Sequence, residues 1–308
     1  MDMNNSKKGV YLVLLTALVS GFSIFINSYG VKEFDSSIFT FLKNAVVAVF
    51  LAAIILFAGN FAEIKNLSRK NWLQLAFIGL LGGSIPFLLF FKGLQLTTGT
   101  TSGFIQKTIF IYTAVFAFIF LKEKLTKSLF IGALLLAVGN YFMLKPSFAF
   151  SIGHVFVLTA TIMWAAEYTY SKKALSDMSG TAVAFGRMFF GSIFILIFLA
   201  GTGKLEKLSL LTSSHFMWIG ISSLFLLLYV MSFYNGLKEI KVTTAACILS
   251  LGMPITTLLG VIFAGKAVTI QQSMGMLLIV AGVSLIAWFS KIASFVGSIF
   301  KVKDYGRD

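Results

Sequence analysis

Apolar residues run along this chain in long continuous blocks that are separated by short polar segments. A helix needs roughly 20 apolar residues to cross a hydrocarbon core of about 30 Å. Continuous blocks of this kind favour helices over the alternating pattern of a transmembrane barrel. We predict ten membrane-spanning helices, at residues 9–29, 37–58, 71–92, 99–121, 127–144, 151–171, 180–201, 214–236, 243–264 and 269–289.

The composition supports this assignment. The 308 residues are 58% hydrophobic and only 12% charged, whereas a soluble domain carries about 25% charged residues. So few charges cannot cover the surface of a soluble protein, and we predict an all-α polytopic membrane protein. The net charge of +14 is explained by basic residues collecting in cytoplasmic loops, so no nucleic-acid partner is expected.

Basic residues are distributed unequally between the two sides of the predicted bundle. Of the 25 Lys and Arg residues, most fall on the side that holds both termini. The opposite side holds only Lys32, Lys92, Lys145, Lys204, Lys207 and Lys266. Because basic loops remain in the cytoplasm, we predict an inner (plasma) membrane protein with both termini cytoplasmic. Residues 291–308 are predicted to form an amphipathic tail on that surface, in contact with membrane lipids.

The chain contains two copies of one five-span unit. The segment "FFKGLQLTTGTTSGF" (90–104) aligns with "FYNGLKEIKVTTAAC" (233–247), and the register continues to the glycines of the fifth and tenth spans. An offset of 144 aligns Ser23 with Glu167 and Lys43 with Arg187. Because five is odd, the second copy (147–290) must be inverted relative to the first (1–146). Inverted repeats with a site between them are typical of secondary transporters.

Several motifs resemble the ten-span, EamA-type branch of the drug/metabolite transporter superfamily, over residues 8–289. They include "WAAE" (164–167), a basic residue early in the second span of each half, "LGMPITTLLGVIF" (251–263) and the Glu-x-Leu-Thr end of "FIFLKEKLT". The resemblance implies a ten-helix bundle around a central polar cavity, usually exporting small metabolites such as amino acids or drugs. The first half departs from the pattern, with no tryptophan in "SGFS" (20–23) and Ile111 where Pro254 stands.

Four ionisable side chains lie inside predicted spans: Lys43, Lys107, Glu167 and Arg187. Each costs about 2.5–3.5 kcal/mol at the centre of a bilayer, so each must face protein or water. Glu167 is the only carboxylate well inside a span, and two interpretations remain open. It either forms a static pair with Arg187 or faces the cavity as a proton-accepting or substrate-binding group. Lys43 and Arg187, at matching repeat positions, are predicted to brace the spans.

Further side chains are predicted to form the cavity. Lys107 follows small and polar residues on one helical face, where it could bind an anionic group, or its long stem could reach the outer interface. Aromatic residues near Glu167 are candidates for apolar walls. The predicted substrate-binding or cavity residues are therefore Ser23, Lys107, Tyr112, Trp164, Glu167, Tyr168, Tyr229 and Tyr234.

Pro86 and Pro254 interrupt the third and ninth predicted spans. A proline removes a backbone hydrogen bond and kinks a helix. These kinks either act as hinges and expose carbonyls to the cavity or are static bends. Gly82, Gly83 and Gly103 are predicted to permit close approach between helices.

The sequence contains no P-loop, HExxH, GxSxG or metal-binding spacing. We therefore expect no enzyme, no metal and no cofactor. The predicted function is secondary active transport, with export of small polar metabolites by alternating access. The expected partners are a small-molecule substrate and membrane lipids, with protons as a candidate coupling ion and a second copy of the chain as a candidate partner. The alternative is a non-transporting lipid-binding or assembly protein with the same bundle.

Overall fold

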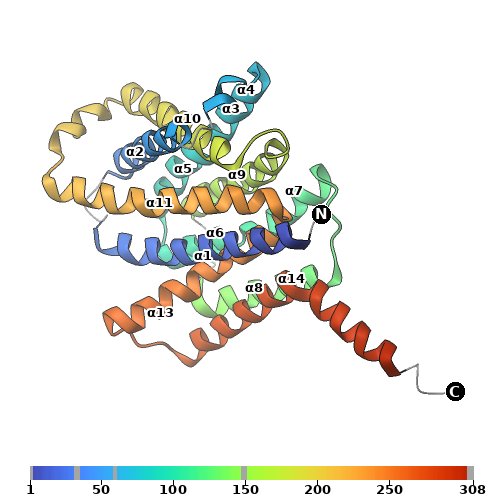
Figure 1. Cartoon of the computed structure of the whole chain (residues 1–308). Helices are drawn as coiled ribbons and strands as arrows, with labels where there is room; N and C mark the ends of the chain where they lie inside the picture. Colours follow the sequence, from blue (N-terminus) through green and yellow to red (C-terminus); the bar gives the residue numbers. More distant parts are fainter. Residues whose placement is uncertain (1–2, 31–34, 58–60, 147–150, 304–308) are drawn as a thin grey trace.

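The computed structural model describes residues 3–30, 35–57, 61–146 and 151–303. The helices of the first repeat are α1 (Met3–Gly30), α2 (Ser36–Phe57), α3 (Phe61–Lys65), α4 (Arg69–Ile78), η1 (Gly79–Ser84), α5 (Ile85–Leu96), α6 (Gly99–Lys107), α7 (Ile109–Phe120) and α8 (Lys127–Leu144). Those of the second are α9 (Ile152–Ala174), α10 (Gly180–Gly201), η2 (Lys204–Leu210), α11 (Ser213–Glu239), α12 (Val242–Ile248), η3 (Leu249–Leu251), α13 (Gly252–Ala264) and α14 (Ile270–Lys303). Figure 1 shows these helices gathered into one bundle, from which the end of α14 projects.

Membrane crossing follows from the length and apolar character of these helices. Within the described ranges, nine helical segments are long and apolar enough to span a membrane. The remaining predicted span, the sixth (151–171), corresponds to α9, whose 23 residues extend about 35 Å at 1.5 Å per residue. Its hydropathy is lower because it carries His154, Trp164 and Glu167. The protein is thus an all-α polytopic membrane protein, as the sequence predicts.

Three of the ten spans are broken near their middle. The third consists of α4, the π-helical turn η1 and α5, the fourth of α6 and α7, and the ninth of α12, the 3₁₀ turn η3 and α13. The break in the third span follows from the sequence "GLLGGS", directly before Ile85 and Pro86. Glycine tolerates irregular backbone, and a proline two residues later cannot donate to the preceding turn.

The two repeats pack in a symmetrical way. α8 packs against α14 and α2 against α10, so each contacts its own counterpart in the other repeat. α1 packs against α11, and α5 packs against α9. Exchanging the repeats converts the α1–α11 contact into the α9–α5 contact, as an approximate two-fold axis requires. In Figure 1 the pairs α1–α11 and α8–α14 lie side by side.

Paired glycines show that the counterpart helices are inverted. A Cβ on Gly132 would lie 2.9 Å from the carbonyl oxygen of Gly282, and one on Gly275 would lie 2.6 Å from that of Gly139. Since residue numbers rise along α8 as they fall along α14, these two helices are antiparallel. The aligned glycines therefore form the seam between the repeats, because only glycine permits backbones to approach so closely.

The same arrangement occurs at the two exchanged contacts. A Cβ on Gly9 would lie 3.0 Å from the carbonyl oxygen of Gly236, and one on Gly93 would lie 2.7 Å from that of Gly153. In the repeat alignment Gly9 corresponds to Gly153 and Gly93 to Gly236. Each pair is thus the image of the other across the two-fold axis.

One contact between the repeats has no counterpart at the other end of the bundle among the described residues. The Glu123 carboxylate accepts a hydrogen bond from the backbone N–H of Val242 (2.9 Å) and another from the Thr243 hydroxyl (2.7 Å). It therefore joins the α7–α8 connection to the start of α12. The residue aligned with Glu123 in the second repeat is Lys266, which cannot accept such bonds.

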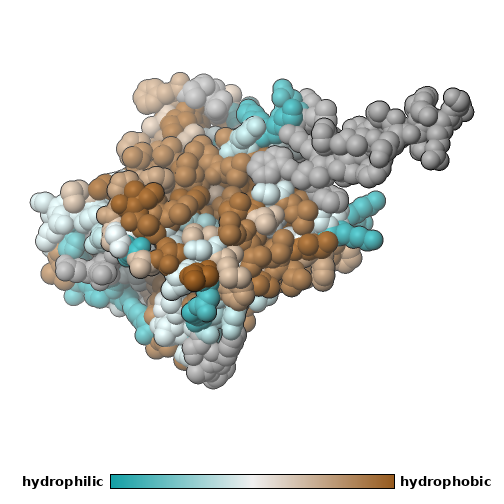
Figure 2. Space-filling model, turned by 90° about the horizontal axis from the view of Figure 1, so that it is seen from below, coloured by the Kyte–Doolittle hydropathy of each residue, from teal (hydrophilic) through white to brown (hydrophobic). Residues whose placement is uncertain are grey.

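The outer surface of the bundle is apolar. Large hydrophobic side chains that point outward include Phe57, which is 92% exposed, and others on α8, α13 and α14. Figure 2 shows a broad brown, hydrophobic area on one face of the bundle, with hydrophilic residues mainly toward its edges. Such a surface matches the hydrocarbon core of a bilayer.

Two expectations fall partly beyond the described residues. α14 continues past the predicted tenth span as far as Lys303, so it includes most of the predicted tail of 291–308. Residues 304–308 lie outside the described ranges, as do Lys32 of the charge count and the proposed repeat boundary at 147.

Candidate functional site

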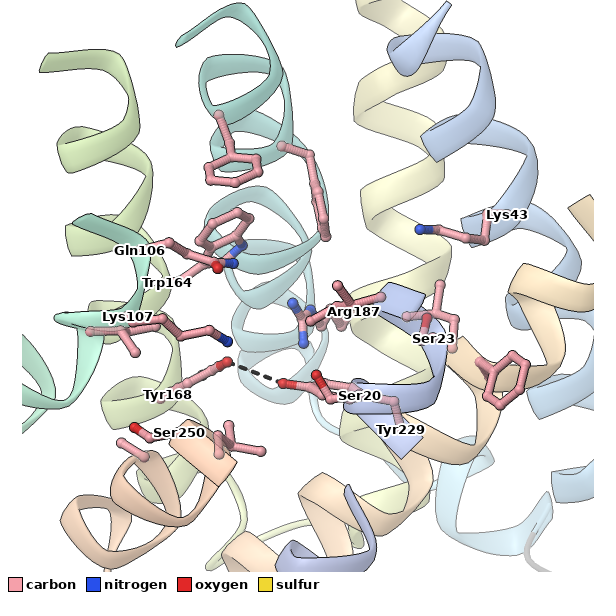
Figure 3. Close-up of a pocket in the computed structure, with 18 of the residues that line it drawn as sticks. Ser20, Ser23, Lys43, Gln106, Lys107, Trp164, Tyr168, Arg187, Tyr229 and Ser250 are labelled. Carbon is pink, nitrogen blue, oxygen red and sulfur yellow. Dashed lines mark hydrogen bonds between the residues drawn. The ribbon is translucent and has the colours of Figure 1, made fainter. Parts of the chain in front are cut away.

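A cavity of about 240 Å³ lies between the two repeats. The first repeat contributes residues of α1, α2, α5, α6 and α7, and the second contributes residues of α9, α10, α11, α12 and η3. Figure 3 shows the side chains of Lys107 and Lys43 pointing inward from opposite sides, with Arg187 between them. The polar side chains of the lining are Ser20, Ser23, Lys43, Gln106, Lys107, Tyr168, Arg187, Tyr229 and Ser250.

The carbonyl of Gly82, four residues before Pro86, is an acceptor that side chains of two other helices share beside this cavity. In a regular α-helix the N–H of residue 86 would bond the carbonyl of residue 82, but proline has no N–H. The Gly82 oxygen accepts from Arg187 Nη2 (3.0 Å) and from the indole N–H of Trp164 (3.2 Å). The neighbouring Gly83 carbonyl accepts from the Asn44 amide at 2.9 Å. The broken third span thus fixes side chains of three other helices.

The Glu167 carboxylate lies behind the cavity wall and is completely buried. Its Oε1 accepts hydrogen bonds from the hydroxyls of Ser171 (2.5 Å) and Tyr234 (2.7 Å). The same Tyr234 hydroxyl accepts from Arg187 Nη1 at 3.2 Å. Within the described ranges no nitrogen of Arg187 comes within 4.0 Å of a Glu167 oxygen. Neither of the two sequence interpretations fits fully, because Tyr234 bridges the two charges.

Close approach of Gly82 keeps this bridged group compact. A Cβ at Gly82 would lie 2.7 Å from Glu167 Cγ and 3.0 Å from Arg187 Nε. A Cβ at Gly83 would lie 2.5 Å from the Arg187 carbonyl oxygen. The predicted close approach at these two glycines is confirmed. At Gly103 it is wrong, because a Cβ there would meet Leu144 at an ordinary 3.7 Å.

Lys43 and Lys107 face the cavity in a different way from Arg187. The Lys43 ammonium lies over the rings of Phe39 (4.9 Å) and Phe87 (5.9 Å), which attract a cation through their π faces. Among the hydrogen bonds and ion pairs of the described residues, none involves the amine of Lys43 or of Lys107. Both amines are therefore available to an occupant of the cavity.

Aromatic side chains form two packed walls. On one, the indole of Trp164 contacts the rings of Phe87 (5.2 Å) and Phe90 (5.4 Å). On the other, the Tyr168 and Tyr229 hydroxyls lie 3.3 Å apart, marked by the dashed line in Figure 3. Both of these tyrosines pack against Phe233 in the core, at 4.7 Å and 5.8 Å between ring centroids. The walls are thus apolar surfaces supported from behind.

The structure brings most of the predicted cavity residues together. Ser23, Lys107, Trp164, Tyr168 and Tyr229 line the cavity. The two basic residues predicted to brace the spans, Lys43 and Arg187, line it as well. Three predicted cavity residues are not part of the lining: Tyr112, Glu167 and Tyr234.

Their positions have a physical reason. A cavity position for Tyr112 follows from one continuous helix over 99–121, but the fourth span breaks at Thr108, where ψ is 0°. The break changes the face that α7 presents, and Tyr112 then lies outside the lining. Glu167 and Tyr234 are covered by the cavity-lining side chains and form a hydrogen bond with each other instead.

Pro254 has no N–H and lies four residues after Ser250, a residue of the cavity lining. The Ser250 carbonyl therefore lacks the donor that a regular α-helix would supply, as the Gly82 carbonyl does before Pro86.

Several lining residues are absent from the sequence prediction, among them Ser20, Phe87, Phe90 and Gln106. Gln106 precedes Lys107 directly, and Phe87 follows Pro86, so their neighbours already pointed to this region. The rings themselves carry no signal in a chain that is 15% aromatic.

The model of the EamA-like transporter family matches residues 7–145 and again residues 151–288. The chain belongs to the EamA-like transporter family. Each of the two matched stretches contains five of the spans described above. The EamA-like fold is accordingly present twice in the chain, and the protein is a membrane transporter.

Relatives of this EamA-like protein carry matching names. An uncharacterized transporter of Clostridium kluyveri is 23% identical over 90% of this chain and 92% of its own length. The uncharacterized transporter YyaM of Bacillus subtilis is 24% identical, covering 89% and 92%. The uncharacterized inner membrane transporter YicL of Salmonella typhimurium is 27% identical, covering 94% and 98%. A solved crystal structure shares the fold with a TM-score of 0.74 at 17% identity, over 95% of this chain and 99% of that one.

Proposed function

We propose that this protein is a secondary active transporter that exports small polar metabolites by alternating access. The observation that carries the proposal is a cavity with three basic side chains, placed between two inverted repeats inside a membrane-spanning bundle. Inverted repeats can rock about a fixed site, which opens it to one side and then to the other. Export is supported by the resemblance of the sequence motifs, since exporters are the usual members of that branch.

The size of the cavity favours metabolites over drugs. Its volume is about 240 Å³. Pockets for drug-sized ligands usually begin at about 300 Å³. We therefore propose solutes of about the size of an amino acid.

Flux through the purified protein tests the proposal. Proteoliposomes loaded with a panel of labelled amino acids, organic acids and amines should exchange at least one of them with the external solution. Vesicles of both orientations, with and without a pH gradient, would report direction and coupling. Absence of flux for every solute, from protein that still binds one of them, would contradict transport and favour the alternative of a non-transporting binding protein.

We also propose an inner-membrane location with both termini cytoplasmic, supported by the distribution of basic residues and by the name of the YicL relative. The only cysteine, Cys247, is 1% exposed, so the chain suits labelling at introduced cysteines. In a Cys247→Ala background, Ser209→Cys should react with an impermeant maleimide in intact cells, and Asn5→Cys should react only after lysis. The reverse pattern would invert the proposed topology.

Glu167 is proposed to hold Arg187 at the cavity rather than to carry protons. Its complete burial and its bridge to Arg187 through Tyr234 support this role. In Glu167→Gln the amide oxygen can still accept from Tyr234, but the charge that compensates Arg187 is lost. Substrate affinity should therefore fall, while a pH dependence of flux should persist. Loss of the pH dependence with unchanged affinity would instead favour the proton-accepting role.

A further inference from the structure

The charges around the cavity are strongly unbalanced. Three basic side chains, Lys43, Lys107 and Arg187, line it, and no carboxylate does so among the described residues. The nearest acid, Glu167, has no exposed surface, and its Oε1 is already occupied by two hydroxyls. It offsets at most the charge of Arg187, to which Tyr234 connects it. Two amines therefore remain without an anionic partner.

An unpartnered ammonium group inside a bilayer is costly. Most such groups pair with an acid, and this chain provides none to Lys43 or Lys107 within the described ranges. The two amines enter the cavity from opposite walls, α2 and α6 (Figure 3). An anion in the cavity would lie among Lys43, Lys107 and Arg187, and ammonium groups form charge-assisted hydrogen bonds with carboxylates.

The rest of the lining limits which anions fit. Phe87, Phe90 and Trp164 form a continuous aromatic surface, and the Trp164 indole N–H is already used by the Gly82 carbonyl. Inorganic phosphate or sulfate could meet the amines, but its oxygens on the side of these rings would lose their hydration without gaining a donor. An organic anion with a flat apolar body would bury that body on the rings and keep its carboxylate near the amines.

From these observations we propose that the cavity selects small organic carboxylates with an aromatic or apolar body and no ammonium group. This inference rests on the proposed transport function and names its substrate class. A zwitterion is disfavoured because its ammonium would meet three cations and no carboxylate in the lining. An amine is excluded for the same reason.

Three probes of one shape and different charge test the inference: phenylpyruvate, phenylalanine and phenethylamine. Binding to the purified full-length protein is measured by isothermal titration, independently of flux in proteoliposomes. Phenylpyruvate should bind about tenfold or more tightly than phenylalanine, since the ammonium of phenylalanine would be buried beside three cations with no carboxylate to accept from it, and phenethylamine should not bind. Equal or tighter binding of either of the other two probes, or no binding of phenylpyruvate, would overturn the inference.

Variants assign the effect to the amines. Lys107→Gln and Lys43→Gln should each weaken phenylpyruvate binding about tenfold, and Lys107→Arg should restore it. Lys266→Gln is the matched control, because Lys266 is an exposed lysine away from the cavity. Unchanged binding in both cavity variants would overturn the inference. Binding of phenylpyruvate without flux of any probe would leave it standing and contradict the proposed transport.

Discussion

The two repeats place different groups at matching positions. In the second repeat, Glu167 and Arg187 belong to one buried group, linked by the Tyr234 hydroxyl. In the first, the aligned residues are Ser23 and Lys43, and both line the cavity. The helices that carry them, α9 with α10 and α1 with α2, are related by the approximate two-fold axis.

The difference shows what one substitution does to a duplicated scaffold. With a carboxylate on the first span of a repeat, the arginine has a compensating charge and the region can pack tightly. With a serine there, the basic residue has no such charge and rests on aromatic faces instead. Duplication thus places polar groups at matching positions in both repeats. Because Glu167 is present in the second repeat only, the group around Arg187 is packed, whereas Lys43 remains available to a ligand.

The largest expected effect comes from removing the basic residue on each side. Arg187→Met leaves Glu167 buried without its compensating charge, and such a loss costs about 3–5 kcal/mol of unfolding free energy. Lys43→Met removes only contacts with rings, worth about 1 kcal/mol. Denaturant unfolding in mixed micelles measures both. Similar losses in the two variants would show that the repeats do not differ in this way.

Removal of the bridging hydroxyl should come next. In Tyr234→Phe both Glu167 and Arg187 lose a hydrogen bond, which costs about 1.5–3 kcal/mol because the partners are charged. Tyr229→Phe is the matched control, since among the described residues its hydroxyl meets only that of Tyr168, at 3.3 Å, and its loss should cost about 0.5–1.5 kcal/mol. The free energy of unfolding is measured in the same way. A larger loss of stability in Tyr229→Phe than in Tyr234→Phe would contradict the bridging role of Tyr234.

A smaller effect is expected from filling the space beside the bridge. Gly82→Ala places a Cβ within 3.0 Å of both Glu167 and Arg187, and overpacking of this kind costs about 1–3 kcal/mol. Gly220→Ala, in α11, meets nothing within 4 Å and should stabilise the helix by about 0.5–1 kcal/mol. Opposite signs for these two variants are the outcome to check by thermal unfolding.

These comparisons also show what could be predicted from the sequence. Ten spans were predictable because apolar length is a local property, and the inverted repeat because glycines such as Gly132 and Gly275 keep their register. Charges inside spans, such as Lys107 and Arg187, point to the site by their cost alone. The bridging role of Tyr234 was not predictable, because it depends on the π-helical turn that brings Gly82 against Glu167.

The smallest effect concerns a partly exposed ion pair between Asp35, at the start of α2, and Lys207. The same helix carries Lys43, which has no acidic partner among the described residues. Burial raises the pKa of Asp35, but hydrogen bonds from Lys207 (2.9 Å) and the Ser37 amide and the charge of Lys204 outweigh it, so the pKa is lowered. A lowered folded pKa stabilises the protein above the ordinary value of 3.8, and this contribution is lost as the pH falls through the folded pKa. Because the Lys207 side chain is 50% exposed, this contribution to stability should amount to less than about 1 kcal/mol.

Asp35→Asn should therefore be slightly less stable than the wild type at neutral pH and equal to it below the folded pKa. A difference that persists in acid would contradict a role of the Asp35 charge, because the Asn amide oxygen can still accept the hydrogen bond from the Ser37 N–H. Unfolding at both pH values is the measurement.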